Sequence, residues 1–209
     1  MGESWVYTDF MKIFMHRVWR VIRWPLLGLF VLYMGLVAYR IPAVREKDRS
    51  DKAVAAIHAQ KITVADVTGD HLPPPPNQAD NDSTLAGIDS NNNGIRDDVE
   101  LAIFKLHPDS ARIRAAELQY AMALQNELTN VFDSQTLVAA IQEENRAYFC
   151  VGDMYKIGQD KLLDAEIKNV EALVLNTDTR KKKYQEIYQK YMTSFADLKN
   201  VSNCDIKTQ

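Results

Sequence analysis

The longest apolar run of the chain is Trp24–Tyr39, which contains no charged residue and lies between Arg23 and Arg40. As an α-helix this run would be about 24 Å long, whereas the hydrocarbon core of a bilayer is about 30 Å thick. A spanning helix therefore has to include apolar neighbours out to Ile41, and the flanking arginines have to reach toward the lipid headgroups. We expect a transmembrane helix over residues 24–41, with aromatic side chains near both ends as is typical of membrane interfaces.

A buried core helix and a cleaved signal peptide both have patterns similar to this one. A signal peptide also places an apolar run after a basic region, but here the run begins late and consists mostly of large residues. It is followed by RIPAVREK, which is no small-residue cleavage site. The pattern favours an uncleaved single-pass anchor.

Residues 1–23 precede this anchor and combine apolar side chains near helical spacing with basic residues between them. The apolar positions are Trp5, Val6, Phe10, Ile13, Phe14, Val18 and Ile22. Such a helix is typical of a segment that lies on an anionic membrane surface. We expect residues 1–23 to form an amphipathic segment on the cytoplasmic leaflet.

Residues 42–84 have the pattern of a stalk followed by a proline-rich linker. Residues 43–60 predict a short helix that leaves the membrane, and Lys61–Val67 alternates apolar and polar residues like a short strand. Four consecutive prolines, Pro73–Pro76, cannot be helical and favour an extended geometry. This stretch is either a docking site for a proline-recognising domain or, as is commoner, a stiff spacer.

Helical periodicity dominates residues 85–209 and predicts a mainly α fold, a small antiparallel bundle. A short helix follows Val99, and Asp109 and Ser134 are expected to cap the next two helices. A break at residues 176–178 separates the last two. The expected inward positions are Ile113, Tyr120, Leu124, Leu128 and Val131, then Leu137, Val138, Ile141, Tyr148 and Phe149, then Leu162, Leu163, Ile167, Val170 and Val174, and finally Tyr184, Ile187, Tyr188, Tyr191 and Phe195.

The charges of the chain are unevenly distributed. Residues 1–52 hold 9 Lys/Arg and 5 Asp/Glu, so the remaining residues hold 16 and 23 of the totals of 25 and 28. A body with that acidic excess repels phosphate backbones, which argues against nucleic acid as a ligand. Cations are more natural partners.

With 209 residues, the chain has room for one domain plus its membrane segment.

One stretch carries a specific chemical pattern. Residues 89–100, DSNNNGIRDDVE, match the twelve-residue calcium loop D-x-[DN]-x-[DN]-G-x5-E at every specified position. Oxygens at the first, third and fifth positions can surround a hard cation, Gly94 permits a sharp turn, and an acidic residue at the twelfth position can supply two more oxygens. An asparagine-rich turn that merely caps the following helix is the alternative, but a cap requires neither the glycine nor the final glutamate.

This stretch resembles EF-hand-like loops, and GIDSNNNGIRDDVE as a whole is similar to a loop in small, poorly characterised bacterial membrane-anchored envelope proteins. The resemblance implies one Ca²⁺ bound by Asp89, Asn91, Asn93, the main chain of Ile95, Asp97 and Glu100. The sequence departs from a paired EF-hand, because prolines replace the entering helix and Arg96 stands at the eighth position, where a paired loop prefers an apolar residue. With two asparagines among the ligands we expect weak affinity, about 10⁻⁴–10⁻³ M, and a structural role.

Cys150 and Cys204 are the only cysteines of the chain. A pair of cysteines in an exported domain favours a disulfide, although two separate buried thiols are the alternative.

Basic residues flank the anchor on both sides, so charge does not decide its orientation. The cysteines and the short N-terminal tail favour the cytoplasm for the N-terminus. The helical domain is then extracytoplasmic, or periplasmic, on a plasma or inner membrane.

No catalytic motif is present, so the sequence indicates no enzyme class. The four histidines have no helical ligand spacing that would indicate zinc. The stretch RKKK at residues 180–183 and the tyrosines after it resemble a basic-aromatic patch, but the aromatic residues have core spacing, which favours an ordinary amphipathic helix with Lys181–Lys183 facing solvent. Two functions remain: a membrane-anchored domain with one structural calcium ion, or a metal-independent scaffold that binds an envelope protein through its bundle. An unrecognised hydrolase would need a cleft that the sequence cannot show.

Overall fold

The computed structural model describes the backbone of residues 4–155, 158–193 and 204–206, and the side chains from Phe14 onward within those ranges. Every regular element in these ranges is an α-helix, so the mainly α prediction is confirmed. The helices are α1 (Ser4–Ala59), α2 (Val64–Thr68), α3 (Gln78–Asp82), α4 (Asp97–Leu106), α5 (Ala111–Asn130), α6 (Ser134–Gly152), α7 (Asp160–Val174) and α8 (Asp178–Tyr191).

The chain divides into two units, residues 1–49 and residues 50–209. The first unit consists of most of α1, which continues through Pro25 and Pro42 without a break. Its most apolar window has a mean hydropathy of 1.9 and none of it is buried, so by length and composition α1 can cross a membrane. The apolar face predicted for residues 1–23 falls partly on side chains before Phe14, which lie outside the described residues.

The second unit begins at Ser50, well before the predicted domain start at residue 85. Ile57, at the end of α1, is 1% exposed, and Pro73 of the proline run is also buried. Residues 50–84, predicted as stalk and linker, are therefore part of the folded unit. The segment joins the core because its few apolar side chains have a protein surface to pack against.

The strand predicted over Lys61–Val67 is wrong. The segment instead contains α2, which starts with a capping box: the Thr63 hydroxyl accepts from the Asp66 backbone N–H, and the Asp66 carboxylate accepts from the Thr63 backbone N–H at 2.8 Å. These reciprocal bonds satisfy amide groups that would otherwise be unpaired at a helix start. Alternation of apolar residues over so few positions does not distinguish one helical turn from a short strand.

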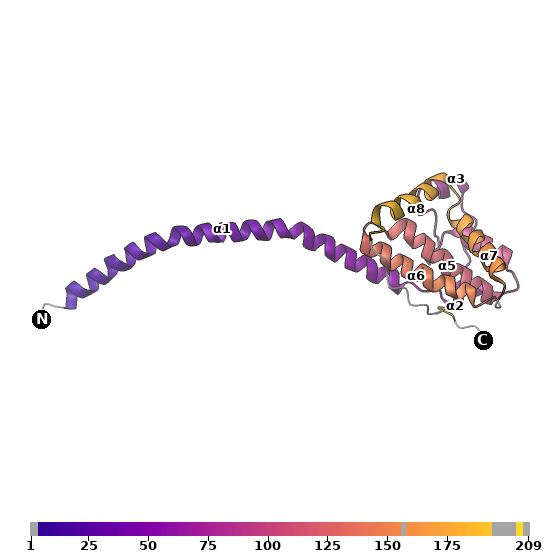
Figure 1. Ribbon diagram of the computed structural model, residues 1–209, viewed down its shortest axis with the longest axis horizontal. Helices are drawn as coiled ribbons and strands as arrows, with labels where there is room; N and C mark the ends of the chain where they lie inside the picture. The colour runs from indigo at the N-terminus through magenta and orange to yellow at the C-terminus, as the bar shows by residue number, and fades with distance from the viewer. Residues whose placement is uncertain (1–3, 156–157, 194–203, 207–209) are drawn as a thin grey trace. The chain divides into compact units, whose positions relative to one another are not determined.

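Helix α5 is the centre of the bundle. Every residue from Arg114 to Leu128 is buried, because α2, α4, α6, α7 and α8 all pack against it (Figure 1). The prediction of a helical bundle is thus confirmed, but α5 has no single apolar stripe. It also buries Arg114, Glu117, Gln125 and Glu127, which must find polar partners inside the protein.

The predicted inward positions of the other helices are mostly buried or half-buried. The exception among the described residues is Leu162, which is 53% exposed in the first turn of α7. The helix caps shift by one residue, since Ser110 caps α5 and Asp133 caps α6. Phe195, expected to lie inward, is outside the described residues.

A disulfide between Cys150 and Cys204 joins α6 to the C-terminal tail, with a Cα–Cα distance of 5.1 Å. This confirms the predicted pairing. The adjacent Asp205 is bound on two sides: its carboxylate pairs with Arg146 at 2.6 Å and accepts from the Ile62 backbone N–H at 3.0 Å. The tail is therefore fixed to the bundle by a covalent bond and by buried polar contacts.

A polar cluster of three glutamates and three tyrosines fills the bundle between α5, α6, α7 and α8. Its members are Glu127, Glu144, Glu171, Tyr120, Tyr184 and Tyr188. Tyr188 donates to Glu127 at 3.0 Å, and Tyr120 lies within hydrogen-bond distance of both other glutamates. Burial raises the pKa of Glu127 well above its usual range, and the charge of Glu144 raises it further.

This cluster predicts a pH-dependent stability. Folding raises the pKa of Glu127. Its protonated carboxyl group therefore contributes fully to the free energy of unfolding below the unfolded pKa of about 4.3, and this contribution is lost as the pH rises toward the folded pKa. The substitution Glu127→Gln removes the buried ionisation while its amide can still accept from Tyr188. We expect the variant to be more stable than the wild type at pH 8 and equally stable near pH 4, measured by thermal unfolding with far-UV circular dichroism.

The matched control is Glu186→Gln, which removes an exposed carboxylate from α8. This control should follow the wild-type curve at every pH. Parallel curves for Glu127→Gln and the wild type between pH 4 and 8 would show that Glu127 does not titrate in the folded protein.

Candidate functional site

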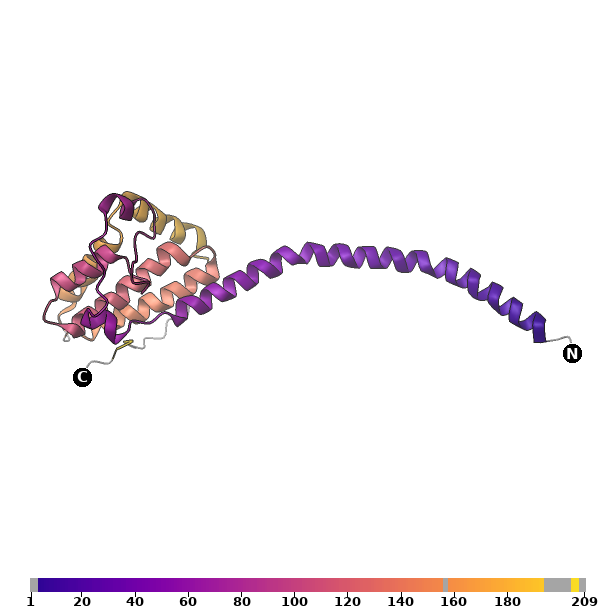
Figure 2. The same cartoon turned by 180° about the vertical axis from the view of Figure 1, so that it is seen from behind.

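The segment between α2 and α4 contains the predicted calcium loop and little regular structure of its own. It lies along one side of the bundle helices, as the magenta trace seen from behind shows (Figure 2). Only the five-residue helix α3 interrupts it. Two fully buried arginines connect it to the bundle: Arg180 of α8 donates to carbonyls of the segment, and Arg96 of the segment donates to carbonyls of α7.

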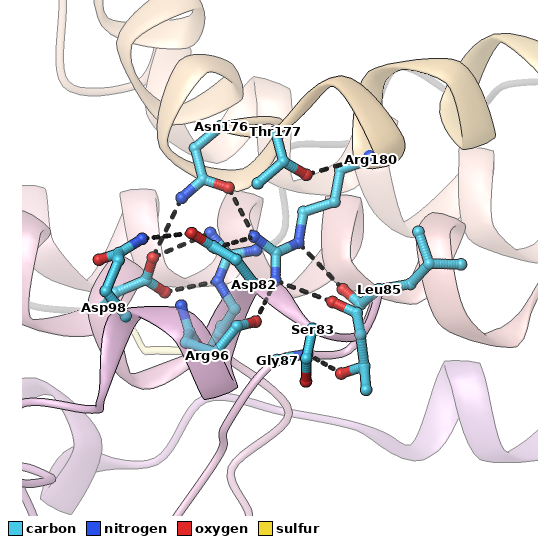
Figure 3. Close-up of polar contacts among 12 residues, drawn as sticks. Asp82, Ser83, Leu85, Gly87, Arg96, Asp98, Asn176, Thr177 and Arg180 are labelled. Atoms are coloured by element: carbon cyan, nitrogen blue, oxygen red, sulfur yellow. Dashed lines mark hydrogen bonds and ion pairs between the residues drawn. The ribbon is translucent and has the colours of Figure 1, made fainter.

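Arg180, in the first turn of α8, donates to the carbonyls of Asn81, Thr84 and Leu85 at 2.6 to 3.2 Å (Figure 3). The same guanidinium pairs with the Asp82 carboxylate at 2.9 Å. Arg180 is 0% exposed, whereas Lys181 and Lys182, which were predicted to face solvent, are exposed. The helical pattern could not show this, because the acceptors come from a distant irregular segment.

Arg96, at the eighth loop position, makes the second anchor. It donates to the carbonyls of Leu173 and Val174 at 2.8 and 3.1 Å, at the C-terminal end of α7. These carbonyls have no partner within their own helix, and a positive charge there interacts favourably with the helix dipole. The arginine also pairs with Asp98 (Figure 3). It therefore fixes the loop to α7, where a paired EF-hand would use a second loop.

Gly87 permits this arrangement. Its backbone has a φ of +68°, and an added Cβ would lie 2.1 Å from the Arg96 side chain. A larger residue would therefore both strain the backbone and displace the arginine.

The first half of the calcium-type loop is folded around Asp89. Its carboxylate accepts from the backbone N–H groups of Asn93 at 3.2 Å and Gly94 at 2.9 Å. Gly94 has a φ of +85°, the left-handed conformation that the sequence pattern requires at the sixth position. Asn93 in turn accepts from the Ile95 N–H at 2.9 Å. The loop thus curls so that Asp89, Asn91 and Asn93 lie on its inner side.

The second half of the loop brings two acidic residues to the same place. Asp97 and Glu100 are both 0% exposed in the first turn of α4. The side-chain amides of Asn91 and Asn93 donate to Oε2 of Glu100 at 3.0 and 3.2 Å. The other carboxylate oxygen of Glu100, Oε1, is buried and has no hydrogen-bond partner among the residues that the structure describes. Asp97 accepts from the Ser90 N–H and hydroxyl, which closes the loop.

The electrostatics of the loop are dominated by buried negative charge. Burial raises the pKa of Glu100 to about 7, against the opposing effect of the two asparagine amides, and the charges of Asp66 and Asp97 raise it further. Burial also raises the pKa of Asp89. Asp66 was not predicted as a site residue. It is 7% exposed, and its carboxylate lies 3.4 Å from the Asn93 amide. In the sequence, the position of Asp66 three residues after Thr63 indicates only the start of a helix.

Four of the six predicted ligand residues, Asp89, Asn91, Asn93 and Glu100, are linked by hydrogen bonds into one group. The fifth, Asp97, is bonded to Ser90, and its charge acts on Asp89 and Glu100. The sixth, Ile95, has its side chain in the core, 1% exposed. Hydrogen bonds of this kind also occur in a simple helix cap. The features that a cap does not need are the buried Glu100 oxygen without a partner and the additional carboxylate of Asp66.

A second cluster of ionisable groups lies away from this loop. His107, at the end of α4, is 2.9 Å from Glu117 of α5 and 3.9 Å from Glu166 of α7. Burial raises the pKa of Glu117 to about 8, and the neighbouring charge of Glu166 raises it further. The sequence does not predict this cluster, since its residues come from three helices and share no regular spacing.

Comparison with protein-family models, with curated protein sequences and with solved structures finds no match to this chain. The function therefore has to be argued from the site itself.

The arginine anchors lead to a prediction about stability. The substitution Arg180→Met keeps the length of the side chain but removes the guanidinium donor from the carbonyls of Asn81, Thr84 and Leu85 and from Asp82. We expect the free energy of unfolding to fall by about 1–3 kcal/mol, as when hydrogen bonds from a charged donor are lost. Urea unfolding followed by far-UV circular dichroism measures it. The exposed neighbour provides the control, since Lys181→Met should change stability by no more than about 0.5 kcal/mol. Equal effects of the two substitutions would contradict an anchoring role for Arg180.

Proposed function

We propose that this protein is a single-pass membrane protein whose helical domain lies outside the cytoplasm and binds one structural calcium ion in the loop of residues 89–100. The observation that carries the proposal is the buried Oε1 atom of Glu100, which has no hydrogen-bond partner within the described part of the chain and belongs to a group of oxygen-bearing side chains. A buried carboxylate oxygen without a partner costs free energy, and a cation bound to it would offset that cost.

The chemistry of the group fits calcium. Asp89, Asp97 and Glu100 are carboxylates, and Asn91 and Asn93 supply amide oxygens once their side chains turn these atoms inward. The main-chain carbonyl of Ile95 completes the set that the loop pattern implies. A hard cation with six to eight oxygen ligands suits this set, and no sulfur or imidazole stands among its members. Asp66 adds negative charge beside the loop.

The role of the ion would be structural. The loop is fixed to α7 through Arg96, and α4 begins inside the loop, so a bound cation would tie α4 to the segment that precedes it. Binding only to the folded state stabilises that state by mass action. An extracytoplasmic domain meets calcium at concentrations that suit weak sites.

The Cys150–Cys204 disulfide supports the orientation of the domain. Disulfides form and persist in oxidising compartments and are rare in the cytosol. The apolar segment of α1 supports the membrane anchor. Together they favour a cytoplasmic N-terminus and a domain on the opposite side of the membrane.

A calcium titration of the full chain in detergent micelles tests the proposal. All three tryptophans, Trp5, Trp19 and Trp24, belong to the first unit, so their fluorescence does not report on the domain. Far-UV circular dichroism is the appropriate probe. At about ten times its dissociation constant, calcium should stabilise the wild type by about 1.4 kcal/mol, a rise of a few degrees in the midpoint. Magnesium at the same concentration should have a smaller effect.

The diagnostic variant is Glu100→Gln, which keeps the size of the side chain and removes its charge. It should fold without calcium and lose the calcium-dependent rise, whereas the surface control Glu186→Gln should keep it. If wild type and Glu100→Gln respond equally to calcium, the loop is only a helix cap. The metal-independent scaffold that binds an envelope partner through the bundle then becomes the preferred function.

Protease protection tests the orientation. In sealed right-side-out vesicles, added protease should reach the domain, and in inside-out vesicles the domain should be protected until detergent is added. Peptides from residues 50–209 are identified by mass spectrometry in each case. Protection in right-side-out vesicles would place the domain in the cytoplasm and contradict the proposal.

A further inference from the structure

The cluster of His107, Glu117 and Glu166 has the geometry of a metal site. One donor atom from each residue lies within 4.8 Å of the other two. The imidazole Nε2 is 2.9 Å from a Glu117 oxygen and 3.9 Å from a Glu166 oxygen. Ligands about 2.0–2.1 Å from a tetrahedral zinc ion are separated by about 3.3 Å, a value between these two distances. Small rotations of the side chains would therefore bring all three donors to one ion.

The buried member of the cluster is Glu117, which is 1% exposed. Among the described residues, no N–H or O–H of a neutral donor reaches either of its carboxylate oxygens, and Nε2 of His107 has no aligned hydrogen-bond partner. The contact between Glu117 and His107 is thus close enough for an ion pair but lacks the alignment of a hydrogen bond. A charge-assisted pair that serves only stability normally directs its N–H at the carboxylate oxygen. Here Nε2 and the two carboxylates, of which Glu117 and Glu166 are close enough to share a proton, converge on one point as ligands of a common ion do.

The fold holds these groups in place from three directions. His107 ends α4, and its carbonyl accepts from Arg114 at 2.7 Å, which fixes the residue against the start of α5. Glu117 follows on the next turn of the central helix, and Glu166 extends from α7, half-buried. A site made from three packed helices needs little reorganisation when an ion binds.

From this geometry we infer that His107, Glu117 and Glu166 bind a divalent transition-metal ion of the zinc class. The imidazole excludes calcium and magnesium as the preferred ions, while two carboxylates and no thiolate disfavour the soft monovalent metals. Three protein ligands leave a fourth position for water or another small molecule, since the cluster is open to solvent at Glu166, whose side chain is 25% exposed. This site is separate from the calcium-type loop and does not depend on it.

The experiment uses the full chain in detergent micelles, stripped of metals by chelator and then supplied with zinc chloride alone. Zinc retained after gel filtration is counted by elemental mass spectrometry, and affinity is measured by competition with a chromogenic chelator. We expect one zinc per chain, with no displacement by millimolar calcium. Cobalt in place of zinc should give the visible absorption of a tetrahedral ion with nitrogen and oxygen ligands.

The variants His107→Gln and Glu117→Gln should each weaken zinc binding by more than the roughly 10–100-fold that follows from loss of an outer-shell partner. The half-buried Glu166→Gln provides a variant that does not disturb the core. Two controls should bind as the wild type does: His58→Gln, which removes an exposed histidine paired with Glu143, and Glu186→Gln, which removes an exposed carboxylate of α8.

Two results would overturn the inference. Either the wild type binds no zinc at micromolar concentration, or its zinc is retained in both His107→Gln and Glu166→Gln. In either case the cluster is only an ion pair between α4, α5 and α7.

Discussion

Two buried guanidinium groups hold the irregular part of this domain in place. Arg180 of α8 donates to three backbone carbonyls of the segment between α2 and α4, and Arg96, within that segment, donates to two carbonyls at the C-terminal end of α7. Arginine suits this task because its planar fork remains charged when it is buried and can reach several acceptors at once. The calcium-type loop keeps its position through this network, so its geometry depends on residues far away in the sequence.

Buried polar side chains also fix the position of the central helix α5. Because α5 is covered on every side, its polar residues cannot face water, and each contacts a particular neighbour: Gln125 donates to the Ala86 carbonyl, and Asn126 donates to Gln60. Such contacts position the irregular segments against the bundle more specifically than apolar packing does. They also leave acidic groups in the interior, at Glu127 and Glu117, whose ionisation opposes folding or favours a cation.

The sequence predicted those features that depend on local pattern. The apolar anchor, the helices of the bundle and the twelve-residue loop all follow from spacing along the chain, and the structure bears out the helices and the cysteine pair. Features that depend on tertiary contacts were missed. The alternation in Lys61–Val67 predicted a strand, whereas in the structure Thr63 and Asp66 cap the helix α2. Neither the burial of Arg180 nor the approach of His107 to Glu117 and Glu166 leaves any periodic signal, because each arises where separate helices meet.

The disulfide has a topological consequence for this network. Cys150 and Cys204 close a covalent ring that contains all of α7 and α8. Arg180 and the two carbonyls that accept from Arg96 lie on this ring. If the backbone is cut once anywhere within it, the two pieces remain joined, and α8 stays close enough for Arg180 to rebind its acceptors at high effective concentration. The domain would thereby tolerate a proteolytic nick between its last two helices without releasing the calcium-type loop from its anchors.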